Sequence, residues 1–275
     1  MELQAYLDRI AYAGPVQPDL ETLRAIHRAH VESIPYENLD VQFGVTVSRA
    51  VPEIFDKIVR RRRGGWCYEM NGLLSWALEE IGFRVTRLAG GVGREVRGDT
   101  AVGNHLVLLV DLGEIWLADA GFGNGLIEPI RLREGAFRVG PLNCSLSRIG
   151  SGWYRYVDDA ITGGPSFDFH QDVSDEALLE ERCRFLQSEP SSNFVLNAVV
   201  QRWRRDEHYS LRGRTLTRIN SGGKGTTTVE SADAYVATLR DTFDLDLPEA
   251  ARLWPKICAR HETLFASVPD GQSGA

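Results

Sequence analysis

The chain has 275 residues, of which 43% are hydrophobic and 25% are charged, and its formal net charge is −7. This composition is typical of a globular protein with one large domain or two to three smaller ones. The negative balance argues against a nucleic-acid partner. No apolar run approaches the ~20 residues that a membrane-spanning helix needs, so we expect no membrane partner.

The cysteines and the N-terminus indicate a compartment. The N-terminus, Met1–Gln4, lacks the charged region and apolar core of a secretory signal. The cysteines are scattered and show no CxxC pattern, which argues against both a disulfide framework and a zinc site. We therefore expect a cytoplasmic protein with free thiols and no metal. The four cysteines are Cys67, Cys144, Cys183 and Cys258.

The first third of the sequence is predicted to be helical. Apolar residues recur at helical spacing from Leu3 onward. Asp19 and Ser48 are the expected N-caps of a second and a third helix. A fourth helix is expected to begin at Cys67 and to end at Gly82, because glycine commonly terminates helices.

The central part, from Phe83 to about Phe169, is predicted to be an antiparallel sheet. Short apolar runs alternate there with Gly, Asn and Asp, as in a small barrel. Ser174 or Asp175 is expected to cap the helix that follows.

The last third mixes strands and helices. Two strands are expected, over Phe194–Trp203 and His208–Ile219, followed by a loop over Ser221–Gly225. Ser231 is expected to begin a helix, and a last helix is expected over about 248–265. The tail after 269 is predicted to be disordered.

A hairpin in the central part brings a histidine and an aspartate together. Asp111-Leu112-Gly113 separates two apolar runs, which predicts a three-residue loop with Gly113 in a left-handed conformation. Counting back from this loop places Leu109 opposite Ile115 and His105 opposite Asp119, on one face of the sheet. A two-residue loop would instead turn Asp119 to the other face.

Cys67, His105 and Asp119 together form the set of an activated thiolate nucleophile. In such a set the imidazole accepts the thiol proton, and the carboxylate orients the imidazole. Gly64-Gly65 permits an unusual backbone just before the helix of Cys67, and the unpaired N–H groups of a helix N-terminus favour an anion. The N–H of Cys67 or Tyr68 is the expected donor to a tetrahedral oxyanion.

Five segments resemble, in order, the motifs of arylamine N-acetyltransferases, and they cover nearly the whole chain. The most specific is the Arg-Gly-Gly-x-Cys segment combined with the later His and Asp. Tyr36 departs from the pattern, because it stands where the family often has Phe. The segments are Ile34–Leu39, Arg63–Asn71, His105–Val107, Asp119–Gly123 and Leu211–Thr217.

The resemblance implies an α+β fold around a Cys-His-Asp core like that of cysteine proteases. Its parts would be an N-terminal helical bundle that carries the Cys (1–82), a central antiparallel β-barrel that carries the His and Asp (83–173), a connecting helix and strand (174–204) and a C-terminal α/β lid (205–275). The pattern of predicted elements gives a similar division.

The resemblance also implies a reaction: a transferase moves the acetyl group of acetyl-CoA, its co-substrate, to the nitrogen of an arylamine, arylhydrazine or N-hydroxyarylamine. The steps would be ping-pong through an acetyl-Cys67 thioester. Such a reaction belongs to xenobiotic metabolism, and the partners would be CoA and a small aromatic amine or hydrazine.

Residues around the triad are assigned expected roles. Tyr36, Tyr68 and Phe122 are the expected walls of an apolar acceptor pocket that keeps water from the thioester. Glu37 and Arg63 are expected to pair and to brace the site, as the resemblance implies.

Four residues are expected to contact CoA. Gly121, Gly123 and Gly125 alternate after Asp119, and such a loop lets backbone N–H groups approach a phosphate. The resemblance places this loop beside pantetheine and pyrophosphate. Lys224, in a glycine-rich loop, is a further expected phosphate contact.

Three alternatives keep parts of this interpretation. An amide synthase of the same family would use a larger acyl donor. A thiol hydrolase of the cysteine-protease or transglutaminase type would use water or a protein amine as acceptor and need no CoA. A binding protein would sequester aromatic ligands in the same cleft without turnover.

Overall fold

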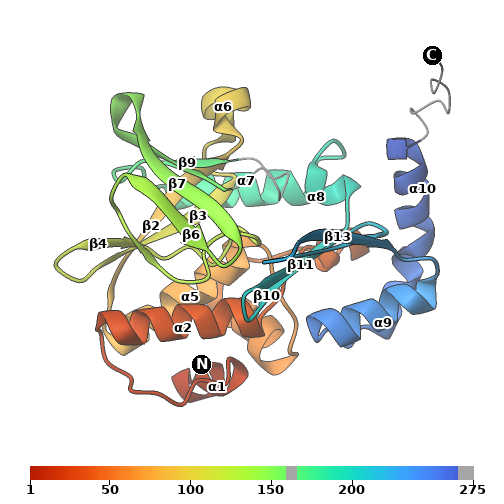
Figure 1. The fold of residues 1–275 in the computed structure, drawn as a ribbon, viewed down its shortest axis with the longest axis horizontal. Helices are drawn as coiled ribbons and strands as arrows, with labels where there is room; N and C mark the ends of the chain where they lie inside the picture. The colour runs from red at the N-terminus through yellow and green to blue at the C-terminus, as the bar shows by residue number, and fades with distance from the viewer. Residues whose placement is uncertain (159–165, 266–275) are drawn as a thin grey trace.

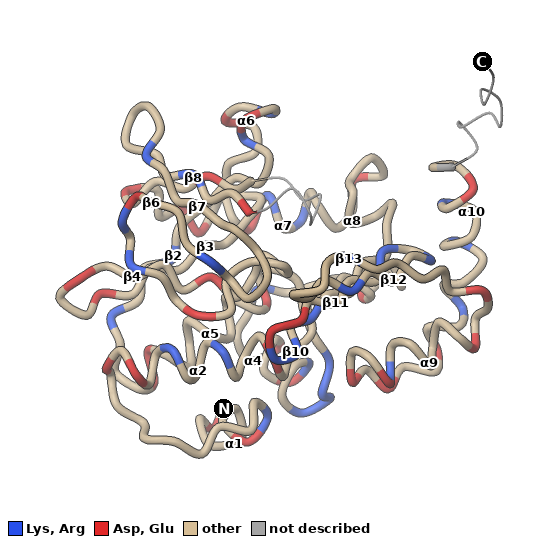
Figure 2. The backbone as a smooth tube through the Cα atoms, in the orientation of Figure 1, with Lys and Arg blue, Asp and Glu red and all other residues tan. Residues whose placement is uncertain are grey.

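The computed structural model describes residues 1–158 and 166–265. Figure 1 shows a sheet-rich upper body above helices α2 (Leu20–Ser33) and α5 (Cys67–Ile81), and a second sheet that leads toward the C-terminal helices. In those two ranges every helix is too short or too polar to cross a lipid bilayer. Basic and acidic residues are interspersed along the chain (Figure 2).

The N-terminal segment is helical, as predicted. Asp19 caps α2, because its Oδ1 accepts the Thr22 N–H over 2.8 Å. The prediction that Ser48 caps the third helix is wrong. Its Oγ accepts the N–H of Ala50, which is the actual N-cap, so Ser48 forms a local turn before the helix. The other elements here are α1 (Leu3–Arg9), α3 (Leu39–Phe43), α4 (Val51–Phe55) and the π-helical turn η1 (Asp56–Arg60).

Helix α5 begins at Cys67 and stops at Gly82, as predicted. Gly82 adopts a left-handed conformation with φ of 104°, which a residue with a side chain rarely adopts. All residues of the helix from Cys67 to Leu78 are buried. It packs against strands β2 (Arg84–Val92) and β3 (His105–Asp111), and this contact brings the two sides of the site together.

The central sheet has eight antiparallel strands in the order β5-β4-β3-β2-β9-β8-β7-β6. Its two edge strands, β5 and β6, are consecutive in the chain, so the sheet curls back toward itself. No ladder closes β5 onto β6 within the described residues, and the expected barrel is therefore open. The remaining strands are β4 (Ile115–Leu117), β5 (Ile130–Arg131), β6 (Gly135–Val139), β7 (Leu142–Ile149), β8 (Trp153–Val157) and β9 (Phe167–Phe169).

The predicted register of the β3–β4 hairpin is wrong by two residues. Leu109 pairs with Leu117 instead of Ile115, and the three-residue loop is 112–114 instead of 111–113. Gly113 is left-handed as expected, with φ of 85°, but it stands in the middle of the loop. Because side chains alternate along a strand, a two-residue shift keeps both partners on the same face.

The second sheet has five antiparallel strands in the order β1-β10-β11-β12-β13. Its edge strand β1 (Tyr36–Glu37) comes from the N-terminal third, and Tyr36 pairs with Gln201. This pairing joins the segment before α5 to the C-terminal half. The other strands are β10 (Val199–Arg204), β11 (Glu207–Arg212), β12 (Thr215–Asn220) and β13 (Gly223–Thr228).

Three predictions for this region need correction. The segment expected to be a strand from Phe194 begins with a helical turn, α8 (Asn193–Leu196). The strand expected over His208–Ile219 is a hairpin that turns at Gly213, with φ of 56°. The expected loop around Lys224 is strand β13, because its backbone pairs with β12 despite its glycines.

The remaining helices lie mainly in the C-terminal third of the chain. Asp175 caps α7 (Glu176–Ser188), and Ser231 caps α9 (Ala232–Phe243), as expected. A 3-10 turn, η4 (Pro248–Leu253), precedes α10 (Trp254–Phe265), so the last predicted helix has two parts. The tail expected to be disordered lies outside the described residues. Short helical turns complete the list: α6 (Arg94–Arg97), η2 (Gly98–Ala101) and η3 (Gly150–Gly152).

Candidate active site

Cys67 is the first residue of α5, and the residue before it, Trp66, is extended. Within the described residues, the backbone N–H groups of Cys67 and Tyr68 have no hydrogen-bond partner, as is usual for the first turn of a helix. These donors and the positive end of the helix dipole favour an anion beside the thiol. Cys67 is only 3% exposed, and it lines a cavity of about 480 Å³.

His105 and Asp119 are bonded through Nε2 and Oδ2, which lie 2.6 Å apart. Both side chains are buried. The other oxygen of Asp119 accepts hydrogen bonds from Asn71 Nδ2, over 2.9 Å, and from the Gly121 N–H, over 2.8 Å. The carboxylate is therefore fully oriented, with one oxygen directed at the imidazole.

The electrostatics of this pair favour a charged imidazole. Burial alone would lower the pKa of His105, but the Asp119 carboxylate, with a further contribution from Cys67, raises it to about 10. Burial would raise the pKa of Asp119, and His105 with the hydrogen bonds from Asn71 and Gly121 lowers it. An imidazolium is the neighbour that stabilises a thiolate.

Cys67 approaches this pair from the helix. Both Cys67 and His105 line the same cavity, and Cys67 contributes to the raised pKa of the imidazole. Because Nε2 faces Asp119, Nδ1 is the ring nitrogen available to the thiol. The sulfur also lies 3.8 Å from the carbonyl oxygen of Asn104. The structure thus brings the three residues singled out from the sequence together: His105 and Asp119 are hydrogen-bonded, and Cys67 lines the same cavity as His105.

Of the three residues expected to wall the pocket for the acceptor substrate, two line the cavity and one does not. Tyr36 and Phe122 line the cavity that contains Cys67, and the Phe122 ring lies 5.7 Å from that of His105. Tyr68 does not line it. The Tyr68 hydroxyl donates to the carbonyl of Gly103 over 2.7 Å, and its ring packs edge-on against Trp66. Tyr68 is a buried packing residue because helix α5 turns it away from the cavity.

The three glycines after Asp119 do not all line the cavity that contains Cys67. Gly121 lines the cavity, and a Cβ there would lie 2.9 Å from the Cα of Cys67, so the loop can approach Cys67 only without a side chain. Gly123 and Gly125 border a small adjoining space of about 10 Å³ beside Gln201. Gly123 is left-handed, with φ of 78°.

Comparison with known proteins identifies the family. A family model described as N-acetyltransferase matches residues 19–252. The arylamine N-acetyltransferase of Mycolicibacterium smegmatis is 37% identical over 262 residues, which cover 91% of this chain and 94% of that protein. The chain belongs to the arylamine N-acetyltransferase family. It is therefore an enzyme of the acyltransferase class.

Other arylamine N-acetyltransferases extend the likeness in sequence and structure. Human arylamine N-acetyltransferase 1 is 30% identical, with 98% of this chain and 100% of that protein covered. The Mycobacterium marinum structure superposes with a TM-score of 0.85 at 32% identity, over 93% of this chain and 98% of that one. That enzyme has also been solved in complex with CoA.

Two cations at the cavity were missed by the sequence reasoning. Arg97 and Arg212 are the only charged residues, apart from the triad, that line it in the part of the chain that the structure describes. Arg97 ends α6 and Arg212 ends β11. Lys224, the expected phosphate contact, does not line the cavity. A signal for Arg212 was present, since it lies inside the family-like stretch that begins at Leu211.

The expected pair of Glu37 and Arg63 is present and buried. Arg63 Nη2 lies 2.8 Å from Glu37 Oε1, and the same nitrogen lies 2.8 Å from Asp40 Oδ1. Lys57 and Glu69 extend this pair into a network that the sequence reasoning did not foresee. Hydrophobic spacing gave no signal for it, because Lys57 falls in a helical segment with mainly apolar neighbours.

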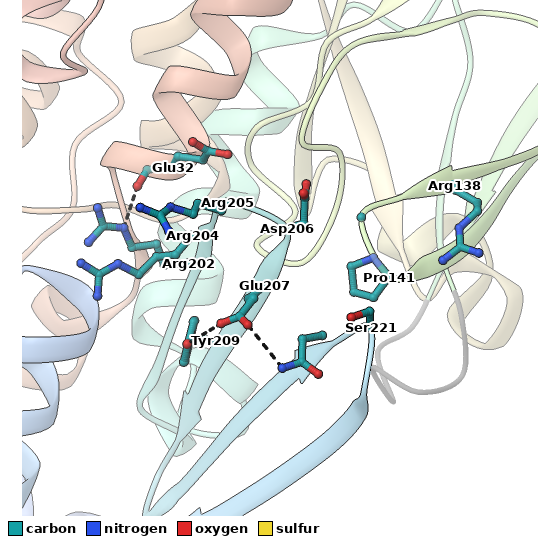
Figure 3. A pocket seen from close by; sticks show the side chains of 12 residues that line it. Glu32, Arg138, Pro141, Arg202, Arg204, Arg205, Asp206, Glu207, Tyr209 and Ser221 are labelled. Atoms are coloured by element: carbon teal, nitrogen blue, oxygen red, sulfur yellow. Dashed lines mark hydrogen bonds between the residues drawn. The ribbon is translucent and has the colours of Figure 1, made fainter.

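A larger hollow, of about 1000 Å³, lies elsewhere, between the β6–β7 and β10–β11 turns (Figure 3). Arg202 and Arg204 contact Asp244, and Glu207 contacts Arg218, so most of its charges are compensated by neighbours. It contains none of the triad. Among the described residues, no cluster of His, Cys, Asp or Glu has the arrangement of a metal site.

Proposed function

We propose that this enzyme transfers the acetyl group of acetyl-CoA to the nitrogen of arylamines, arylhydrazines or N-hydroxyarylamines through an acetyl-Cys67 thioester. The observation that carries the proposal is the placement of Cys67 and His105 at the wall of one cavity, with His105 bonded to the buried Asp119 behind it. Family membership favours acyl transfer over the hydrolase and the binding protein.

The first half-reaction forms the thioester. His105 holds the proton of the Cys67 thiol, and the thiolate attacks the carbonyl carbon of acetyl-CoA. The N–H groups of Cys67 and Tyr68 stabilise the oxyanion, and one such donor is typically worth about 3 kcal/mol in the transition state. The C–S bond to CoA then breaks, and the CoA sulfur takes the proton from His105.

The second half-reaction discharges the thioester. The amine nitrogen attacks the acetyl carbon of acetyl-Cys67, and His105 accepts the proton that the nitrogen loses. The bond to Cys67 breaks, and the thiolate with its imidazolium partner is restored. Asp119 keeps the ring of His105 in one orientation through both steps. Tyr36 and Phe122 supply apolar surface that keeps water from the thioester.

Arg97 and Arg212 are the side chains that we propose for the CoA phosphates. Both are exposed at the cavity lining, and guanidinium groups suit phosphate oxygens. Gly121 borders the path of pantetheine. The four cysteines form no disulfide, which is in keeping with the cytoplasm, where we place the reaction. The proposed acceptors assign the reaction to xenobiotic metabolism.

Initial-rate kinetics test the proposed sequence of steps. Acetyl-CoA and hydralazine are varied against each other, and the double-reciprocal lines are expected to be parallel, as in a ping-pong scheme. Intersecting lines would contradict a thioester that survives the departure of CoA.

A further inference from the structure

Five buried charged side chains form a continuous network directly behind the first turn of α5. Lys57 Nζ lies 2.8 and 3.0 Å from the two carboxylate oxygens of Glu69, and 3.0 Å from Asp40 Oδ2. Arg63 joins Asp40 to Glu37. Each of the five is at most 9% exposed.

Glu69 connects this network to the nucleophile. It stands two residues after Cys67, and its Oε2 accepts the backbone N–H of Trp66 over 3.2 Å. Trp66 is the residue immediately before Cys67. One carboxylate therefore holds Lys57 on one side and the peptide that begins the helix on the other.

The backbone just before Cys67 packs closely against Glu69 and against Pro35. A Cβ on Gly65 would lie 2.6 Å from Glu69 Cβ, and a Cβ on Gly64 would lie 2.0 Å from the Pro35 carbonyl oxygen. Neither glycine has a positive φ, so the reason for them is close approach, and not the unusual backbone expected from the sequence. A displacement of the Glu69 carboxylate would thus be transmitted to the backbone of Cys67.

The network carries three carboxylates and two cations, and an uncompensated buried charge is costly. Glu69 is faced by Lys57 from η1, by Glu37 from β1 and by Asp40 from α3. Burial raises the pKa of Glu69 to about 7, against the opposing effect of Lys57. Burial alone would lower the pKa of Lys57, but the three carboxylates hold it above its ordinary value. Lys57 is therefore the cation that favours the ionised form of Glu69 against the effect of burial.

We propose that Lys57 is a positioning residue for Cys67: its ammonium holds the Glu69 carboxylate against the Trp66 N–H and so fixes the first turn of α5 and the direction of the thiol. Lys57 touches none of the reacting atoms and acts through Glu69. The proposal rests on the proposed function only in taking Cys67 as the nucleophile.

The test compares Lys57→Met, Glu69→Gln and the double variant with the parent. The rate constant for alkylation of Cys67 by iodoacetamide is measured across pH ~5 to ~9, together with the single-turnover rate of acetylation by acetyl-CoA. Lys57→Met is expected to lower both rates by about 10- to 100-fold, because misplacement of a reacting group by about 1 Å has effects of that size. Lys256→Met, on an exposed part of α10, is the matched control.

The double variant distinguishes positioning from a loss of packing. The side-chain amide that Glu69→Gln introduces still accepts the Trp66 N–H through its oxygen and needs no cation, so the double variant is expected to recover rates within about threefold of the parent. The pH profile gives a second signature. Lys57→Met is expected to shift the alkylation profile to higher pH by about half a pH unit, and Glu69→Gln is expected to shift it to lower pH by about the same amount. The double variant is expected to shift the profile little.

Several outcomes would overturn the proposal. One is a Lys57→Met enzyme with a lower melting temperature but with the parent's rate constants and pH profile. If Lys57→Met does not fold, the profile of Glu69→Gln still decides, and an unshifted profile counts against the proposal. Alkylation needs no acetyl-CoA. A parent that takes up no acetyl group but shows the expected alkylation pattern would therefore contradict the proposed function and leave the positioning role supported.

Discussion

Asn71 on α5 binds the carboxylate of Asp119, with Nδ2 and Oδ1 2.9 Å apart. The same amide nitrogen donates to the Leu106 carbonyl, and the amide oxygen accepts the N–H of Ala120. One buried side chain thus ties α5 to β3 and to the loop after β4. The relative placement of thiol, imidazole and carboxylate depends on this amide.

Asn71→Ala is expected to lower the acetylation rate by about 10- to 100-fold, because the Asp119 carboxylate loses a donor that orients it. The substitution also leaves the Ala120 N–H and the Leu106 carbonyl without their partner, which costs about 1–3 kcal/mol per buried group. Single-turnover acetylation and urea unfolding measure the two effects. Asn220→Ala, at the end of β12, is the control, and a rate for Asn71→Ala equal to that of this control would contradict the role.

The His105–Asp119 pair predicts a pH dependence of stability. The pKa of folded His105 is raised to about 10, above the ordinary value near 6.5. The pair's contribution to the free energy of unfolding is therefore complete below pH ~6.5 and is lost as the pH rises through about 10. Urea unfolding at several pH values should show a steeper decline for the parent than for His105→Gln between pH ~7 and ~10. Parallel curves would argue that the imidazole is neutral in the folded enzyme.

Gly64→Ala is expected to destabilise the fold severely. Its Cβ would lie 2.0 Å from the Pro35 carbonyl oxygen, and a backbone atom cannot yield as a flexible side chain can. We expect a loss of more than about 2 kcal/mol, in the range of overpacking in a well-packed core. The matched control is Gly225→Ala on β13, where a Cβ meets nothing within 4 Å. Equal melting temperatures for the two variants would be incompatible with the close packing before Cys67.

Arg212→Met and Lys224→Met test two assignments of the CoA phosphates against each other. The cavity geometry predicts that Arg212→Met raises the KM for acetyl-CoA by about 10- to 150-fold, the usual worth of a charged hydrogen bond, with a smaller change in kcat. Lys224, on β13, should have little effect. A raised KM for Lys224→Met with an unchanged KM for Arg212→Met would instead support Lys224 as the phosphate contact, as the sequence predicted.

The parts of the site that local signals encode were predictable. Short-range chemistry predicts the start of a helix at Cys67 and its end at Gly82, and the structure confirms both. It also predicts the helix caps at Asp19 and Asp175, which the structure likewise confirms. The prediction that His105 and Asp119 share one face of the sheet is confirmed although the predicted register was wrong. A shift by an even number of residues leaves each side chain on the same face.

Other parts depend on contacts between distant segments, which spacing does not encode. Tyr68 follows the nucleophile directly, yet α5 turns it toward Gly103 and away from the cavity. Lys224 was expected in a loop because of its glycines, but pairing with β12 decides its conformation. The cluster of Lys57 and Glu69 joins segments whose side chains meet only in the folded chain.

The central claim is that Cys67 carries the acetyl group between the two substrates. The most direct test is the intact mass of the protein after mixing with acetyl-CoA, beside Cys67→Ala and Cys67→Ser. The parent is expected to gain a single acetyl group that Cys67→Ala does not gain and that hydralazine removes. A parent that gains no acetyl group, while its thiol is reduced and can be alkylated, would contradict acetyl-CoA as the donor.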